Sequence, residues 1–404
     1  MKYLLYYNLD SKFVTDQTNA GGDGTNVVSV VDGVAWCKDS ENTYYRYSSN
    51  SGDIVTFTVT VHYKNADLGA DICEPDIIHV KSYSGCSTTE MLYPKKFDNL
   101  VPSITVANLT ISSNMEYTFF YEYEDLTLVP LTFKVTSPGE ICWTHYWGGY
   151  ASTYAIDVLT IQYSKNGGEW TNITSDSGAS APRFSVEAGD VVRFRGDNIT
   201  YGMGWPHNTW ESNMFSGTTC QFELVGNIMS LIQSSGFETL DELNKNAPTP
   251  AYGYNWTFTR LFSNCTGLTS AKRLVLPATK LWSGCYQCMF SDCINLVYGP
   301  EILPGAVLKE VCYNSMFYGC QSLLKSPEIL ATTNGGSWTM ESMFAECSSL
   351  NYIKCMLSSV STDYVNSWVR GVGNSGTFVK NKNNNNWTTG ISGIPEGWTV
   401  QDAN

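Results

Sequence analysis

The residues best suited to bind a ligand lie in two aromatic, glycine-rich stretches, 142–150 and 201–210. Aromatic rings stack on the apolar face of a sugar while nearby polar groups fix its orientation. The stretches therefore contain a candidate glycan platform, formed by Trp143, Tyr146, Trp147, Trp205 and Trp210. The same residue types also fill the core of a small β-sandwich or a seam between domains. The sequence leaves both interpretations open.

Metal-ligating side chains occur in the same stretches. Each contains one of the four histidines of the chain, His145 and His207, and Cys142 lies close to the first. A zinc site would need ligands at a recurring spacing, and none recurs here. We therefore expect neither a metal nor any other cofactor.

The remaining reactive groups form no known catalytic pattern. A phosphate loop, a nucleophile elbow and a His-Glu-x-x-His motif are all absent from the sequence. The pair Cys285-x-x-Cys288 lies inside a repeat, where Cys312 matches Cys285 one repeat later. A redox or zinc motif would need a partner pair of cysteines or a thioredoxin-like context. No catalytic residue is assigned, and the chain is interpreted as a non-enzymatic protein.

A tandem repeat organises the C-terminal half of the chain. Its motif Phe-x-x-Cys-x-x-Leu occurs four times, beginning each time at one of four almost evenly spaced phenylalanines. Self-similarity at a fixed period of roughly 20 to 50 residues indicates a solenoid, in which each unit buries its apolar face against its neighbours. The repeated residues are Phe262, Cys265, Leu268, Phe290, Cys293, Leu296, Phe317, Cys320, Leu323, Phe344, Cys347 and Leu350.

Spacing within the repeat predicts its local structure. Met316, Phe317 and Cys320 would share one side of a short helical turn, since residues three and four apart lie on one helix face. The apolar stretches near 301–304 and 328–331 are too short for helices and suit strands. Each coil is thus expected to contain a short helix and a short strand. The cysteines are expected to be small, buried, reduced packing residues.

The repeat resembles a known family. Met-Phe-x-x-Cys-x-x-Leu followed by Pro-Glu-Ile-Leu is similar to the BspA-type leucine-rich repeats in surface proteins of gut and oral bacteria and in proteins of their phages. The closing segments 349–355 and 393–400 resemble the terminal cap of that family in Bacteroides-type proteins. The resemblance covers residues 226–404 and implies display and binding.

Alternating apolar residues predict β-domains before the repeats. The expected architecture is mainly β, with tandem Ig-like β-sandwiches followed by a BspA-type leucine-rich-repeat solenoid with short helices. The segments 162–171 and 186–192 resemble the β-domain that often precedes such repeats. The expected boundaries are 1–50 for an N-terminal β unit, 51–128 for an Ig-like sandwich, 129–225 for a second sandwich, and 226–404 for the solenoid with a cap at each end.

Composition restricts the partners. The 404 residues carry a net charge of −14, which disfavours nucleic acids and anionic membranes. No stretch approaches the roughly 18 apolar residues of a membrane span, so no membrane insertion is expected. The first residues lack the pattern of a secretory signal. Thirteen cysteines, an odd number with four in the repeat register, favour reduced thiols over a disulfide framework.

These observations favour a phage structural protein, made in the host cytoplasm and carried on the virion surface as a head or tail fibre or decoration. Its N-terminal region is expected to attach to other virion proteins of the capsid or tail. The repeats would then project toward a host surface glycan or protein, and the protein is expected to be a homo-oligomer. A bacterial cell-surface BspA-like adhesin with a longer precursor is the alternative, and a glycan-active enzyme is a further one.

Overall fold

Strands provide most of the regular structure. The computed structural model describes residues 26–31, 34–38, 44–46, 54–83, 87–146, 158–198, 212–243 and 256–403. The chain divides into two compact units, the first formed by residues 1–65 and 71–122 and the second by residues 66–70 and 123–404. The prediction of a mainly β fold is confirmed.

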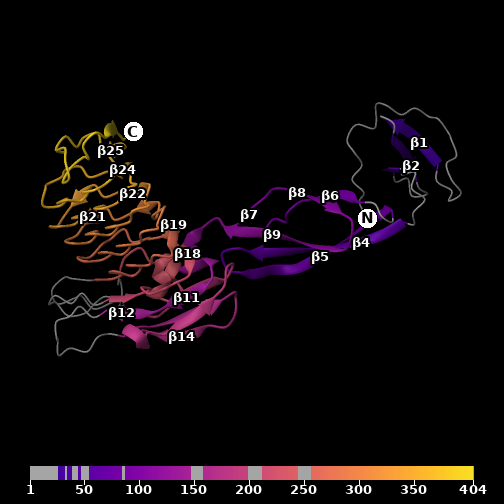
Figure 1. Cartoon of the computed structure of the whole chain (residues 1–404), viewed down its shortest axis with the longest axis horizontal. Helices are drawn as coiled ribbons and strands as arrows, with labels where there is room; N and C mark the ends of the chain where they lie inside the picture. The colour runs from indigo at the N-terminus through magenta and orange to yellow at the C-terminus, as the bar shows by residue number, and fades with distance from the viewer. Residues whose placement is uncertain are drawn as a thin grey trace. The chain divides into compact units, whose positions relative to one another are not determined.

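The first unit is built from antiparallel and parallel strand pairs (Figure 1). One sheet contains β1 (Asn26–Val31), β2 (Val34–Lys38) and β3 (Tyr44–Arg46). A second has the order β5-β4-β9-β7 and contains β4 (Ile54–Asn65), β5 (Ala70–Tyr83), β7 (Leu100–Pro102) and β9 (Met115–Tyr123). A third pairs β6 (Thr88–Leu92) with β8 (Ala107–Ile111). Because side chains alternate along a strand, Val59 and Val61 of β4 meet Ile111 of β8 and Phe119 of β9 in one core.

The second unit begins with a six-stranded sheet of order β14-β13-β16-β10-β18-β19. Its strands are β10 (Thr132–Ser137), β13 (Thr160–Lys165), β14 (Thr171–Thr174), β16 (Val191–Arg195), β18 (Gln221–Asn227) and β19 (Leu268–Val275). Two small sheets pair β11 (Gly139–Cys142) with β15 (Arg183–Val186), and β12 (Thr144–Tyr146) with β17 (Ser212–Met214). The boundary expected at 225/226 falls inside β18, which pairs in parallel with β19 of the first repeat. One hydrophobic core runs through both parts.

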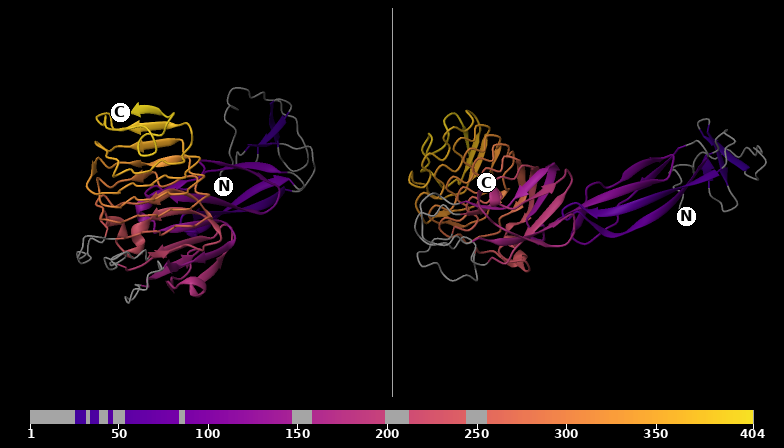
Figure 2. Two further views of the ribbon diagram at one scale, coloured as in Figure 1. Left: turned by 60° about the vertical axis from the view of Figure 1, so that its left-hand side comes forward. Right: turned by 60° about the horizontal axis from the view of Figure 1, so that its bottom comes forward.

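Successive repeats stack as coils, which form the orange to yellow end of the chain in Figures 1 and 2. Parallel strands one repeat apart make a sheet of order β20-β22-β24-β25-β26. Its strands are β20 (Ile302–Leu303), β22 (Lys325–Ile329), β24 (Tyr352–Cys355), β25 (Thr377–Lys380) and β26 (Thr399–Asp402), and β21 (Val307–Leu308) pairs with β23 (Thr333–Asn334) on another side. The stack therefore presents one parallel sheet that grows by one strand per coil.

The expectation of a short helix in each repeat is wrong, because the Met-Phe segments form turns. Among the described residues the only helical segments are 3-10 turns outside the Met-Phe motifs: η1 (Leu126–Leu128), η2 (Gly178–Ser180), η3 (Ile228–Leu231) and η4 (Phe237–Thr239). The Phe290 N–H donates to the Met316 carbonyl at 2.8 Å, and the Phe317 N–H donates to the Met343 carbonyl at 2.9 Å. Cys288 and Ser315 have left-handed φ values of 51° and 52°. The donors thus bond the next coil, whereas an α-helix would bond them within its own turns.

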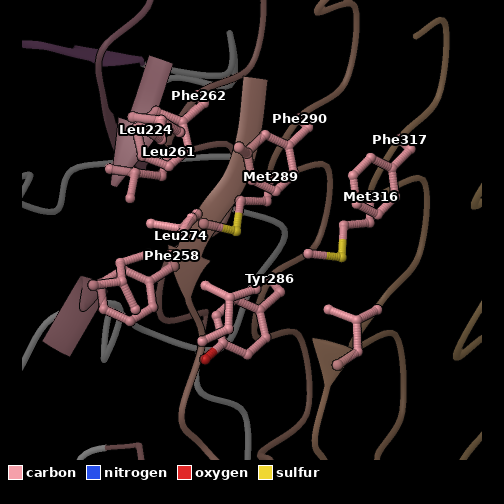
Figure 3. Close-up of a cluster of buried hydrophobic side chains, with 14 of the residues drawn as sticks. Leu224, Phe258, Leu261, Phe262, Leu274, Tyr286, Met289, Phe290, Met316 and Phe317 are labelled. Carbon is pink, nitrogen blue, oxygen red and sulfur yellow. The ribbon is translucent and has the colours of Figure 1, made fainter. Parts of the chain in front are cut away.

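Stacked phenylalanine rings form the centre of the coils (Figure 3). Centroids of neighbouring rings from Phe262 to Phe344 are 5.5, 5.2 and 5.6 Å apart, with interplanar angles of 15°, 11° and 14°. Phe215 extends this column at its N-terminal end, 5.8 Å from Phe262. At the other end Trp368 lies 6.0 Å from Phe344 and stacks on Trp387 at 5.3 Å. A fixed sequence period therefore becomes one continuous aromatic column.

Candidate binding surface

One residue of the predicted aromatic platform, Trp143, lies in the hydrophobic core. Trp143 is fully buried, its Nε1 donates a hydrogen bond of 3.0 Å to the Leu159 carbonyl, and its ring centroid lies 4.8 Å from that of Phe215. A buried indole with its donor satisfied cannot stack on a sugar. The assignment of Trp143 to a glycan platform is therefore corrected.

The other platform residues remain predictions. The backbone of Tyr146 lies in β12 and pairs with Ser212 of β17. Trp147, Trp205 and Trp210 lie outside the described residues, as does His207. His145 is 8% exposed, and the described part of the chain contains no group of three His, Cys, Asp or Glu side chains that could hold a metal ion.

The repeated cysteines occupy the core beside the phenylalanine column. All twelve repeat residues are fully buried. The Sγ atoms of Cys293, Cys320 and Cys347 donate to the carbonyl of the phenylalanine one coil earlier, at 3.0, 3.1 and 3.0 Å. Burial raises the pKa of each of these thiols well above its usual range. Neutral, hydrogen-bonded thiols are poor nucleophiles, so the geometry gives them a packing role.

A groove of about 400 Å³ lies on the second unit where the first repeat joins the six-stranded sheet. It is lined by Glu223, Thr269, Ser270, Lys272, Arg273, Val297 and Tyr298. Tyr298 is 48% exposed and provides the aromatic surface of this groove. Hydroxyl, carboxylate and ammonium groups surround it within one depression.

The cations of the groove are neutralised by neighbouring carboxylates. Arg273 Nη1 lies 2.7 Å from Oδ1 of Asp67, a fully buried residue whose carboxylate also accepts from Lys134 Nζ at 3.3 Å and from the Tyr123 N–H at 2.7 Å. Lys272 Nζ lies 3.8 Å from Glu301. With these pairs formed, the groove suits a polar ligand without a strong net charge.

A row of exposed or half-buried side chains continues from the groove across the stacked coils. Tyr298 bridges to Lys325, and Lys325 pairs with Tyr352 on the next strand. Lys325 Nζ lies 4.7 Å from the centre of the Tyr352 ring, an arrangement that favours the cation over the ring face. Because neighbouring strands are about 4.8 Å apart, the two tyrosines are about 10 Å apart along the stack.

The repeat register of the sequence predicts this row, although its residues are not clustered along the chain as the aromatic stretches are. Tyr298, Lys325 and Tyr352 occupy the same position in three successive repeats. Residues at one position of successive repeats lie side by side on the surface of a stack. Comparing the repeats position by position finds such residues, whereas scanning along the chain for clustered aromatics does not.

Comparison with known proteins adds no relative to these observations: no family model matches the chain, no curated protein matches it, and no solved structure matches it. Among the described residues, no helix has the length and apolar character needed to cross a bilayer.

Proposed function

We propose that this chain is a structural protein of a phage particle, a head or tail fibre or decoration that adheres to a host surface glycan. In this proposal the stacked coils are a BspA-type leucine-rich-repeat solenoid, and the preceding strands form Ig-like sandwiches. The N-terminal region attaches to other virion proteins, and several copies assemble on one particle. The protein is made in the host cytoplasm and carried on the virion surface.

The observation that carries the proposal is the row Tyr298–Lys325–Tyr352 beside the groove. Two tyrosine rings on one face offer stacking surfaces for successive sugar units, and Thr269, Ser270 and Glu223 offer hydrogen-bonding groups around the first ring. A stack of coils also presents this face as an extended surface, which suits a linear polymer.

Weak binding at each site is compatible with firm adhesion. Several copies on one particle make every later binding event intramolecular, so avidity can exceed the affinity of one site by about 10²- to 10⁴-fold. Buried reduced thiols fit folding in a cytoplasm, where thiols are kept reduced, before release in an assembled particle.

The location of the polypeptide tests the phage assignment. Mass spectrometry of particles purified from a producing culture should detect this chain at a stoichiometry of several copies per particle. Its absence from the particles would contradict the proposal. A reading frame that extends upstream into a lipoprotein signal would instead identify the bacterial cell-surface adhesin, and turnover of a glycan would identify an enzyme.

Replacing Tyr298 and Tyr352 together by alanine should lower the affinity of the purified chain for host polysaccharide by about 5-fold to 150-fold. The estimate follows from about 0.5 to 1.5 kcal/mol for each lost aromatic contact, with 1.4 kcal/mol equal to a factor of ten. Titration calorimetry with polysaccharide extracted from the host measures the change.

The matched control for this experiment is Trp338→Ala. Trp338 is 49% exposed, so the control also removes an exposed aromatic ring from the coils, but from outside the row. The control should bind like the wild type and melt at the same temperature. Unchanged binding by the double variant would exclude the row as the glycan site.

A further inference from the structure

Two arginines lie side by side on one face of the six-stranded sheet, and neither has a carboxylate partner among the residues that the structure describes. Arg193 and Arg195 are two residues apart on β16 and therefore point to the same face. The Cζ atoms of Arg195 and Arg193 lie 4.1 and 5.2 Å from the centre of the Trp170 ring. Among the described residues, no carboxylate lies within ion-pair distance of either guanidinium, although Lys134, Lys165 and Arg273 of the same sheet each pair with one.

The neighbouring side chains fix the two guanidinium groups but do not neutralise them. Arg195 Nε donates to Gln162 Oε1 at 2.8 Å, and Arg193 Nη2 donates to Ser164 Oγ at 2.9 Å. Arg193 Nε is buried and has no acceptor among the described residues. The nearby carboxylate of Asp197 accepts from the N–H and the hydroxyl of Ser234. Each guanidinium has five N–H donors, so several remain available to a ligand.

Holding two charged guanidinium groups close together costs free energy when no anion is bound. Burial and the neighbouring charge of Arg195 lower the pKa of Arg193, although the guanidinium stays charged at neutral pH. Two like charges held close together repel each other, and a bound anion would offset that repulsion. A guanidinium stacked on an indole keeps its N–H edge free to bind a planar or tetrahedral anion through two parallel hydrogen bonds.

The surroundings favour an acidic sugar over other anions. Gln162 pairs across the strands with Asn172, and its Nε2 donates to Asn172 Oδ1 at 3.0 Å. The Thr160 and Thr174 hydroxyl groups bond each other at 2.6 Å on the same face. These amides and hydroxyls resemble the groups that bind sugar hydroxyls. The net charge of −14 opposes every polyanion, nucleic acids and acidic polysaccharides alike, so the neighbouring amides and hydroxyls are what favour a sugar.

We propose that Arg193 and Arg195 bind the carboxylate or sulfate group of an acidic polysaccharide, with Trp170 and Gln162 holding the two guanidinium groups in place. This inference rests on the proposed adhesion to a glycan and specifies the charge of that glycan. It adds a second set of contacts, on β13, β14 and β16, to those of the row Tyr298–Lys325–Tyr352.

Paired polymers that differ only in charge test the inference. Dextran sulfate is compared with dextran, and polygalacturonate with its methyl ester, in titrations of the full chain at low salt. The wild type should bind at least one acidic polymer at least about tenfold more tightly than its neutral counterpart. The pair that shows the preference distinguishes sulfate from carboxylate. Salt should weaken the preference, since exposed charges are screened within about 10 Å at 0.1 M.

The variants distinguish binding at the two arginines from nonspecific attraction between the acidic polymers and other cationic side chains. R193Q/R195Q should abolish the preference, and R193K/R195K should lose most of it, because lysine keeps the charge without the planar fork. The control K96Q/K309Q removes two exposed lysines elsewhere and should keep the preference. If R193Q/R195Q fails to fold, R195Q alone gives the same test, since it retains the bond between Arg193 and Ser164.

The outcomes distinguish this inference from the proposed function. The inference would be overturned if the wild type showed no preference for acidic polymers. It would also be overturned if K96Q/K309Q lost as much of that preference as R193Q/R195Q, even if the chain adheres to host cells. Absence from phage particles would overturn the proposed function, while the polymer titrations would still report on the arginine site. Loss of the preference in R193Q/R195Q with its retention in the Tyr298 and Tyr352 double variant would show that the preference depends on the arginines and not on the tyrosine row.

Discussion

Replacing Phe317 by alanine should lower the free energy of unfolding of the second unit by about 3 to 5 kcal/mol, the usual cost of removing a buried aromatic side chain. Phe317 is fully buried and stacks on Phe290 at 5.2 Å and on Phe344 at 5.6 Å. The variant therefore removes two ring contacts and leaves a cavity in the middle of the column, where neighbouring coils cannot close it without losing their own hydrogen bonds.

Chemical denaturation followed by circular dichroism measures this loss. Phe317→Leu is the control, because it keeps an apolar side chain of similar volume and should cost less than about 1.5 kcal/mol. In a stack of repeats, stability depends on contacts between neighbours, so amide exchange should increase first in the coils next to Phe317. Melting of the alanine variant at the wild-type temperature would show that the column does not stabilise the stack.

Raising the pH above about 9 should unfold the second unit. Burial raises the pKa of ten cysteine thiols in this unit, to about 11 for Cys220 and about 12 for Cys312 and Cys355. The other seven are Cys142, Cys265, Cys285, Cys288, Cys293, Cys320 and Cys347. In the unfolded chain a thiol ionises near pH 8.5. Above that pH the folded state binds more protons than the unfolded state, so stability falls as pH rises.

The expected size of this effect is large because many thiols act together. Each thiol that ionises only in the unfolded chain removes about 1.4 kcal/mol for each further pH unit. A typical domain has a total stability of about 5 to 15 kcal/mol. The combined loss within one or two pH units is therefore enough to reach that total.

Urea denaturation at pH 7, 8, 9 and 10, in the presence of a reductant, measures the effect. The midpoint should change little from pH 7 to 8 and should fall steeply between pH 8 and 10. A thiol reagent provides an independent control: Cys293, Cys320 and Cys347 should resist labelling at pH 7.5 and should label at pH 10 as the unit unfolds. A midpoint that does not change up to pH 10 would mean that the thiols are not buried as a group.

The sequence by itself determined the register of the repeats and the positions that face their core. Residues at one position of a regular stack must occupy the same environment, so the nearly fixed spacing of the repeats identifies the buried phenylalanine, cysteine and leucine directly. Alternation within strands such as β4 likewise indicated a mainly β fold. These inferences depend only on spacing along the chain, which tertiary packing does not change.

Tertiary structure decided the properties that depend on neighbours distant in sequence. The Met-Phe segments form turns because the N–H groups of residues such as Phe317 bond the next coil and not their own turn. Trp143 is a core residue because Phe215 and the Leu159 carbonyl lie against it. The pairing of Arg193 and Arg195 above Trp170 needs the register between β13, β14 and β16. Local patterns carry no information on such contacts, since strands far apart in the chain bring these side chains together.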